Sequence, residues 1–150
     1  MNSEIYEFES SNIYEYRFKS LGKRIITKVV QFAPLNIQGY YNLGFGDLLD
    51  NGLIDDNIES NNNDLKKVIS TIGAILFNFL QQNPGIKVFF HGSNQQRTKV
   101  YGLIIKRNYK VLKNNYVITS LLKIDGILVE MPFEFDDSKN YLGFFIKLNS

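Results

Sequence analysis

The 150 residues carry 17 Lys and Arg against 15 Asp and Glu, and they contain no cysteine. Disulfides, thiolate metal sites and cysteine nucleophiles are therefore excluded. A hydrophobic fraction of 44% is enough for a packed core. No apolar run has the length of a membrane span, and residues 1–7 do not resemble a signal peptide, so we expect a cytoplasmic protein that does not contact a membrane.

Alternation of apolar and polar residues predicts strands in the first part of the chain. The expected strands are residues 5–9, 14–19, 24–32 and 40–45. Pro34 should end the third strand, because proline lacks the amide N–H that a sheet uses. Strands in this succession form an antiparallel meander with one buried face. Residues 46–63 contain five acids and no base, which is typical of a loop.

Apolar residues at helical spacing predict a helix over residues 65–82. Its buried face should comprise Leu65, Val68, Ile69, Ile72, Ile75, Leu76 and Phe79. Asn62 or Asn63 can cap this helix, with Asp64 in the first turn. Residues 83–85, Asn-Pro-Gly, should end it.

The second part of the chain alternates strand and helix signals. We expect a strand at 86–90, a helix that starts near Ser93 or Asn94, a strand region at 123–135 kinked at Gly126 and Pro132, a turn at 136–140 and a strand at 141–148. Asn residues between 108 and 115 leave open whether a third, short helix follows. The prediction is a single α+β domain over residues 1–150, an N-terminal antiparallel β-meander followed by α-β-α(α)-β-β.

Charge is unevenly distributed along the chain. Residues 65–124 hold ten Lys and Arg and no acid, whereas residues 1–64 hold ten acids against five bases. Five of the bases, Lys99, Lys106, Arg107, Lys110 and Lys113, are interleaved with Tyr101, Tyr109 and Tyr116. Basic residues among aromatic ones suit single-stranded nucleic acid, but a solvated helix face has the same composition.

The segment Gly92-Ser93-Asn94, followed by Arg97 and Lys99, is the candidate ligand site. Free amides at the start of a helix and a guanidinium one turn later can hold a phosphate. In the alternative interpretation, Ser93 or Asn94 is only a helix cap, Arg97 pairs with an acid from residues 47–64, and Tyr101 belongs to the core.

Other candidate residues give weaker signals. His91 is the only histidine and is a candidate general base, with Arg97 and Tyr101 as further catalytic candidates. Ser93, His91 and an acid could together supply the hydroxyl, imidazole and carboxylate of a Ser-His-Asp triad. The acids between 47 and 64, best represented by Asp47 and Asp64, have the oxygen ligands of a Mg²⁺ site. Their spacing does not match an EF-hand loop, and acids in loops are usually solvated, so no metal or other cofactor is predicted.

Several stretches together resemble a family of small bacterial proteins, common in the Bacteroidetes, that is described as a domain of unknown function. They are residues 41–47, 55–56, 60–64 with Lys67 and Val68, and Gly92-Ser93 with Arg97-Thr98. The resemblance extends from about Tyr6 to Lys147 and implies one compact domain. Asn63 stands where the family pattern has glycine, which leaves open whether the turn there needs a positive φ angle.

The basic middle of the chain leads to two functional hypotheses. In the first, a basic face binds RNA or another phosphate-rich ligand, in a toxin–antitoxin or defence pair. Whether the protein is an enzyme stays open; in RNA cleavage Arg97 would stabilise phosphate charge while His91 or Tyr101 moved protons. In the second, the chain is a non-enzymatic protein-interaction module, homo-oligomeric or with a protein partner, in which the acidic loop and the basic block pair.

Overall fold

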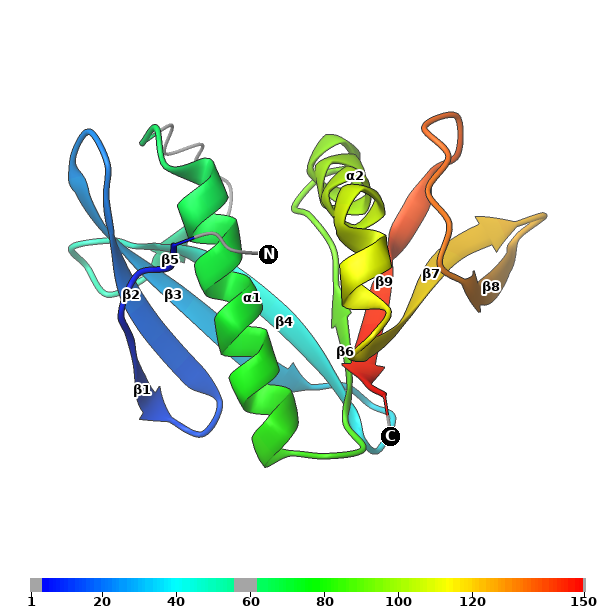
Figure 1. Cartoon of the computed structure of the whole chain (residues 1–150), viewed down its shortest axis with the longest axis horizontal. Coiled ribbons are helices and arrows are strands. Elements are labelled where there is room, and N and C mark those ends of the chain that lie inside the picture. Colours follow the sequence, from blue (N-terminus) through cyan, green and yellow to red (C-terminus); the bar gives the residue numbers. More distant parts are fainter. Residues whose placement is uncertain (1–3, 56–61, 150) are drawn as a thin grey trace. The chain divides into compact units, whose positions relative to one another are not determined.

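The computed structural model describes residues 4–55 and 62–149, which form two helices and nine strands (Figure 1). Their contacts divide the chain into two compact units. The N-terminal unit comprises residues 4–33, 43–55 and 62–83, and the C-terminal unit comprises residues 34–42 and 84–149. The structure is mixed α and β, as the sequence predicts.

Three of the four expected N-terminal strands occur near their expected positions, whereas the first begins at Phe8 and not at Ile5. The observed strands are β1 (Phe8–Asn12), β2 (Glu15–Leu21), β3 (Ile25–Pro34), β4 (Tyr40–Leu48) and β5 (Ile54–Asp55). They lie in the order β1-β2-β3-β4, and β5 pairs with β4. The prediction of a loop from residue 46 is wrong at its start, because β4 continues to Leu48 and pairs antiparallel with β5. Asp47 can lie inside this sheet because Lys28 neutralises its charge there.

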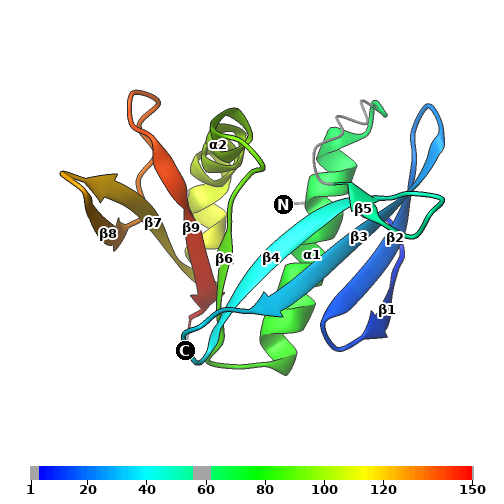
Figure 2. The same ribbon diagram turned by 180° about the vertical axis from the view of Figure 1, so that it is seen from behind.

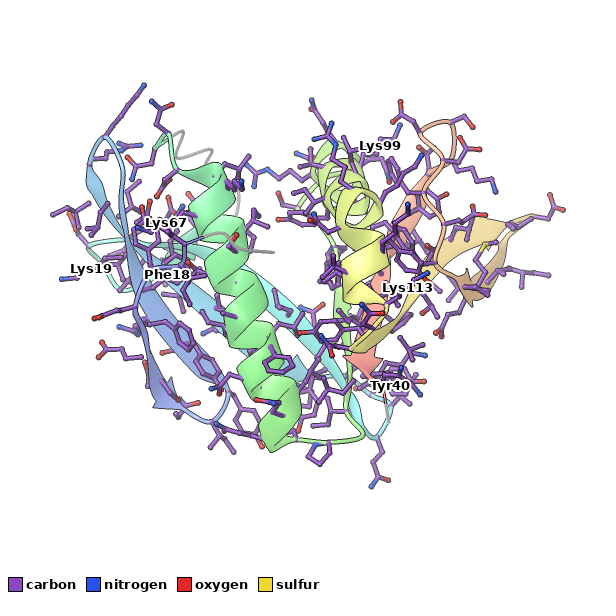
Figure 3. The ribbon with its side chains drawn as sticks, viewed as in Figure 1. Phe18, Lys19, Tyr40, Lys67, Lys99 and Lys113 are labelled. Carbon is purple, nitrogen blue, oxygen red and sulfur yellow. The ribbon has the colours of Figure 1, made fainter. Side chains whose placement is uncertain are left out.

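Helix α1 (Leu65–Gln82) has the predicted bounds and packs along β2 and β3 (Figure 1). Its buried residues are Val68, Thr71, Ile75, Leu76, Phe79 and Leu80. The Phe79 ring stacks on Phe32 of β3, with 3.9 Å between centroids. Figure 3 shows Phe18 of β2 directed toward α1 and Lys19 directed away from it. Leu65 is 66% exposed, so its predicted burial is wrong and the apolar face starts one turn later.

The turn before α1 differs from the expected cap. Asp64, not Asn62 or Asn63, occupies the N-cap position, and its side chain does not cap the helix. Asn62 is buried, where its amide nitrogen donates to Ser20 Oγ at 2.8 Å and to the Arg24 carbonyl at 2.7 Å. Asn63 has a φ of 64°, a left-handed conformation that asparagine tolerates better than most residues.

The C-terminal unit contains one helix and four complete strands that are hydrogen-bonded to one another. Its elements are β6 (Lys87–Phe90), α2 (Gln95–Leu112), β7 (Tyr116–Ile124), β8 (Ile127–Pro132) and β9 (Tyr141–Leu148). The strand order is β6-β9-β7-β8, and the pairs β6–β9, β9–β7 and β7–β8 are antiparallel. From behind, β6 and β9 lie in front of α2 (Figure 2), so α2 covers one face of this sheet.

Two predictions for this unit need correction. The expected short third helix is absent from the described chain between α2 and β8; α2 is followed by β7. The predicted strand 123–135 is a hairpin that turns at Asp125 and Gly126, whose φ angles are 50° and 79°. Two successive residues with positive φ form the tight turn that a two-residue hairpin needs.

Gly102 brings α2 close to the segment before β9. A Cβ atom there would lie 2.4 Å from the Phe135 ring and 2.8 Å from the Phe144 ring. Only glycine permits this approach, which places the segment 133–140 beside the helix. Of the described helices, neither has the length and apolar character needed to cross a membrane.

Candidate functional site

The segment between β6 and α2 forms the turn that the sequence predicts. The helix begins at Gln95, and the Asn94 side chain caps it by accepting a hydrogen bond from the Arg97 backbone N–H at 2.9 Å. The Gly92 N–H donates to Thr98 Oγ1 at 2.9 Å. A Cβ atom on Gly92 would lie 2.4 Å from Arg97 Cβ, so glycine is required. The predicted helix start near Ser93 or Asn94 is therefore confirmed.

The candidate catalytic side chains contact residues of their own turn or of β6. The Arg97 guanidinium donates from Nη1 to Ser93 Oγ at 3.0 Å. His91 Nδ1 lies 2.9 Å from the Gly92 carbonyl oxygen, and the His91 ring is 5.4 Å from Phe89. The Tyr101 ring lies 6.3 Å from Phe90. Ser93 thus contacts Arg97 and not His91, and the structure does not assemble the triad.

Arg97 and Lys99 lie on different sides of α2. Successive residues of a helix are rotated by about 100°, so these two side chains diverge by about 160°. The structure therefore brings Gly92, Ser93, Asn94 and Arg97 together and separates Lys99 from them.

Lys99 belongs instead to a row of lysines along α2, which we call the lysine stripe. It consists of Lys99, Lys106, Lys110 and Lys113. At the helical rotation of about 100° per residue these four positions fall within about 60° of one another and span about 21 Å of helix axis. Lys113 is the C-cap but keeps helical backbone angles, φ −63° and ψ −16°. Figure 3 shows Lys99 and Lys113 toward opposite ends of the helix.

No acid of α2 interrupts this stripe. Helix α2 contains five bases and no Asp or Glu, and Lys106, Lys110 and Lys113 are exposed. The spacing of seven, four and three residues is the sequence signal for a common face. It is visible in the sequence once α2 is treated as one helix instead of two.

The segment between β8 and β9 lies beside the lysine stripe. Lys99 Nζ donates to the Asp137 carbonyl oxygen at 3.3 Å, and Lys106 Nζ donates to that of Phe135 at 3.4 Å. Together with α2 the segment forms an open groove of about 440 Å³. The groove is lined by Gln96, Lys99, Val100, Leu103, Lys106, Phe135 and Asp137.

A hydrogen-bond network around Glu134 fixes this segment. Glu134 Oε2 accepts from Lys139 Nζ and from the Tyr141 hydroxyl, each at 2.8 Å. The Tyr141 hydroxyl also accepts from the Asp136 N–H at 2.8 Å. The Lys139 bond lowers the pKa of Glu134, and burial raises the pKa of Tyr141 to about 12. At neutral pH Glu134 is therefore ionised and can accept both hydrogen bonds, and the Tyr141 hydroxyl keeps the proton that it donates.

The acids of residues 47–64 do not form a metal site in the described part of that segment. Asp47 Oδ1 lies 2.5 Å from the Nζ of buried Lys28. Asp64 Oδ2 accepts from the Tyr6 hydroxyl at 2.6 Å and from Ser20 Oγ. Asp56 and Glu59 lie outside the described residues. Over residues 4–55 and 62–149, no three His, Asp or Glu side chains are grouped as metal ligands.

Comparison with known proteins identifies a family without an assigned activity. No curated protein and no solved structure is significantly similar to the chain. The sequence matches a family of unknown function (DUF6934) over residues 2–149. This match covers nearly the whole chain, including the turn before α2, the lysine stripe and the segment beside it. The chain therefore belongs to the DUF6934 family.

Proposed function

We propose that this protein binds RNA or another phosphate-rich polyanion along the lysine stripe of α2. The carrying observation is the stripe itself: four lysines on one side of a helix that contains no acid. Like charges on one helix face repel one another and destabilise the helix slightly. A bound polyanion relieves that repulsion and releases its counterions.

The shape of the stripe favours an extended ligand. Four ammonium groups over about 21 Å match a strand of successive phosphates better than one small anion. Lysine is a point charge that binds phosphate with little geometric demand, so the stripe should bind many sequences with similar affinity. A cytoplasmic toxin–antitoxin or defence pair is the setting we propose for such binding, given the small size and basic middle of the chain.

The alternative of an interaction module in which acids and bases pair has less support. It needs the acids of residues 47–64 to be available to the basic block. Asp47 is instead paired with Lys28, and Asp64 with Tyr6 and Ser20.

Two double variants test the proposal. Fluorescence anisotropy of a labelled single-stranded RNA would compare Lys106→Ala/Lys110→Ala with Lys19→Ala/Lys23→Ala at about 0.1 M salt. Each lost phosphate contact costs about fivefold at this salt concentration, so the stripe variant should bind about 25-fold more weakly. The control loses the same charge from exposed positions on and after β2 and should bind nearly as wild type.

Equal losses in the two variants would contradict the proposal, because they would show that only net charge matters. Arg97→Ala examines the helix start separately, since Arg97 faces the other side of α2. A greater loss for Arg97→Ala than for the stripe variant would place the phosphate at the helix start and overturn the stripe as the binding surface.

A further inference from the structure

The groove beside the lysine stripe has an apolar floor that phosphate binding does not use. Val100 and Leu103 line this floor, and they are 42% and 37% exposed. Phe135 completes the floor. Exposed apolar side chains on a helix face that lines a groove are a common feature of ligand sites.

The floor is held in place by the packing beneath it. The Phe135 ring lies against Gly102, and its centroid is 5.6 Å from that of Tyr141. Tyr141 is 1% exposed and binds Glu134 through its hydroxyl. Phe135 therefore does not need a ligand to fix its position, and the groove is preformed.

Two ammonium groups flank the apolar floor. Lys99 and Lys106 are seven residues apart, which is about 10.5 Å along the helix. Each uses one donor on a carbonyl of the neighbouring segment, and an ammonium group has three donors. Each lysine thus keeps donors for a phosphate at either end of the floor.

We propose that this groove holds one unstacked nucleotide of a single strand, with its base on Val100, Leu103 and Phe135 and its phosphates on Lys99 and Lys106. The inference rests on the proposed function and specifies its ligand. A volume of about 440 Å³ lies in the range of pockets that take small ligands. Paired bases in a duplex cannot present a face to the floor, so single strands are preferred over duplexes.

The test distinguishes the contribution of the base to binding from that of the phosphates. Leu103→Gln removes apolar floor while keeping charge and a good helix former. Val111→Gln is the matched control, because Val111 is also exposed on α2 but does not line the groove. The probes are single-stranded oligoadenylate and inorganic polyphosphate of similar charge, which has no base. Val100→Gln is a second groove variant, and thermal melting checks that each variant is folded.

Base stacking predicts that Leu103→Gln weakens oligoadenylate binding at least about fivefold. Polyphosphate binding should stay unchanged, and Val111→Gln should change neither. If both groove variants bind oligoadenylate as wild type does, or lose both probes equally, the nucleotide site is wrong while polyanion binding stands. If wild type binds neither probe at low salt, the proposed function itself fails, and the nucleotide site fails with it.

Discussion

Raising the salt concentration from about 50 to about 200 mM should weaken binding of single-stranded RNA about 50-fold. Each phosphate that a lysine neutralises releases counterions, which gives a slope of about −0.7 per contact in a plot of log affinity against log salt. Four contacts from the lysine stripe predict a slope of about −2.8. Fluorescence anisotropy at several salt concentrations measures this slope directly.

The slope also counts the contacts. Removing Lys106 and Lys110 should reduce it to about −1.4, because two contacts remain. The control variant Lys19→Ala/Lys23→Ala should keep the wild-type slope. A wild-type slope near zero would show that binding does not involve the lysines as phosphate contacts.

Asp47→Ala should lower the free energy of unfolding by about 3–5 kcal/mol, a loss typical of a broken buried ion pair. The Lys28 and Asp47 side chains are only 6% and 10% exposed. Without the carboxylate, the Lys28 charge stays in the interior of the N-terminal unit and loses the attraction of Asp47. Urea denaturation of the variant and of the wild type gives this difference.

Two further variants define the cause of that loss. Asp50→Ala removes an exposed acid nearby and should change the free energy of unfolding by less than about 0.5 kcal/mol. Lys28→Met/Asp47→Leu removes both charges and should be less destabilising than Asp47→Ala alone, because the buried charge that Asp47 balances is removed as well. A loss below about 1 kcal/mol for Asp47→Ala would mean that the pair is solvated.

Local signals were sufficient for α1, for the turn before α2 and for the start of α2. The bounds of α1 follow from its apolar spacing and from Asn83-Pro84-Gly85, which directly follow the helix. The start of α2 follows from Gly92 and the Asn94 cap in the same way. Such elements depend on neighbours three or four residues away, which a sequence displays directly.

Strand β7 could not be placed by the same reasoning. Its partner on one side is β9, so that Ile118 lies opposite Ile146 across a long interval of chain. Residues 114–116 gave no helix stop strong enough to exclude a third helix. Long-range pairing, not local preference, decides that residues 116–124 are extended.

One part of the candidate site could be predicted from local sequence signals, and the other part depends on long-range contacts. The lysine stripe follows from helical periodicity once the full extent of α2 is known. The groove does not, because Phe135 and Asp137 reach α2 only through the close approach at Gly102 and the network around Glu134. Sequence spacing carries no signal for a contact such as that between Lys99 and Asp137.

The most direct test of polyanion binding by the lysine stripe is a ¹H–¹⁵N NMR titration of the full chain. The ligand is single-stranded oligoadenylate about ten nucleotides long, a length within the usual site size of single-strand binders. The predicted result is a set of resonance changes along α2 and in residues 135–137, with few changes in β1, β2 and β3. Changes confined to the N-terminal unit, or no change at low salt, would contradict the binding surface proposed for this protein.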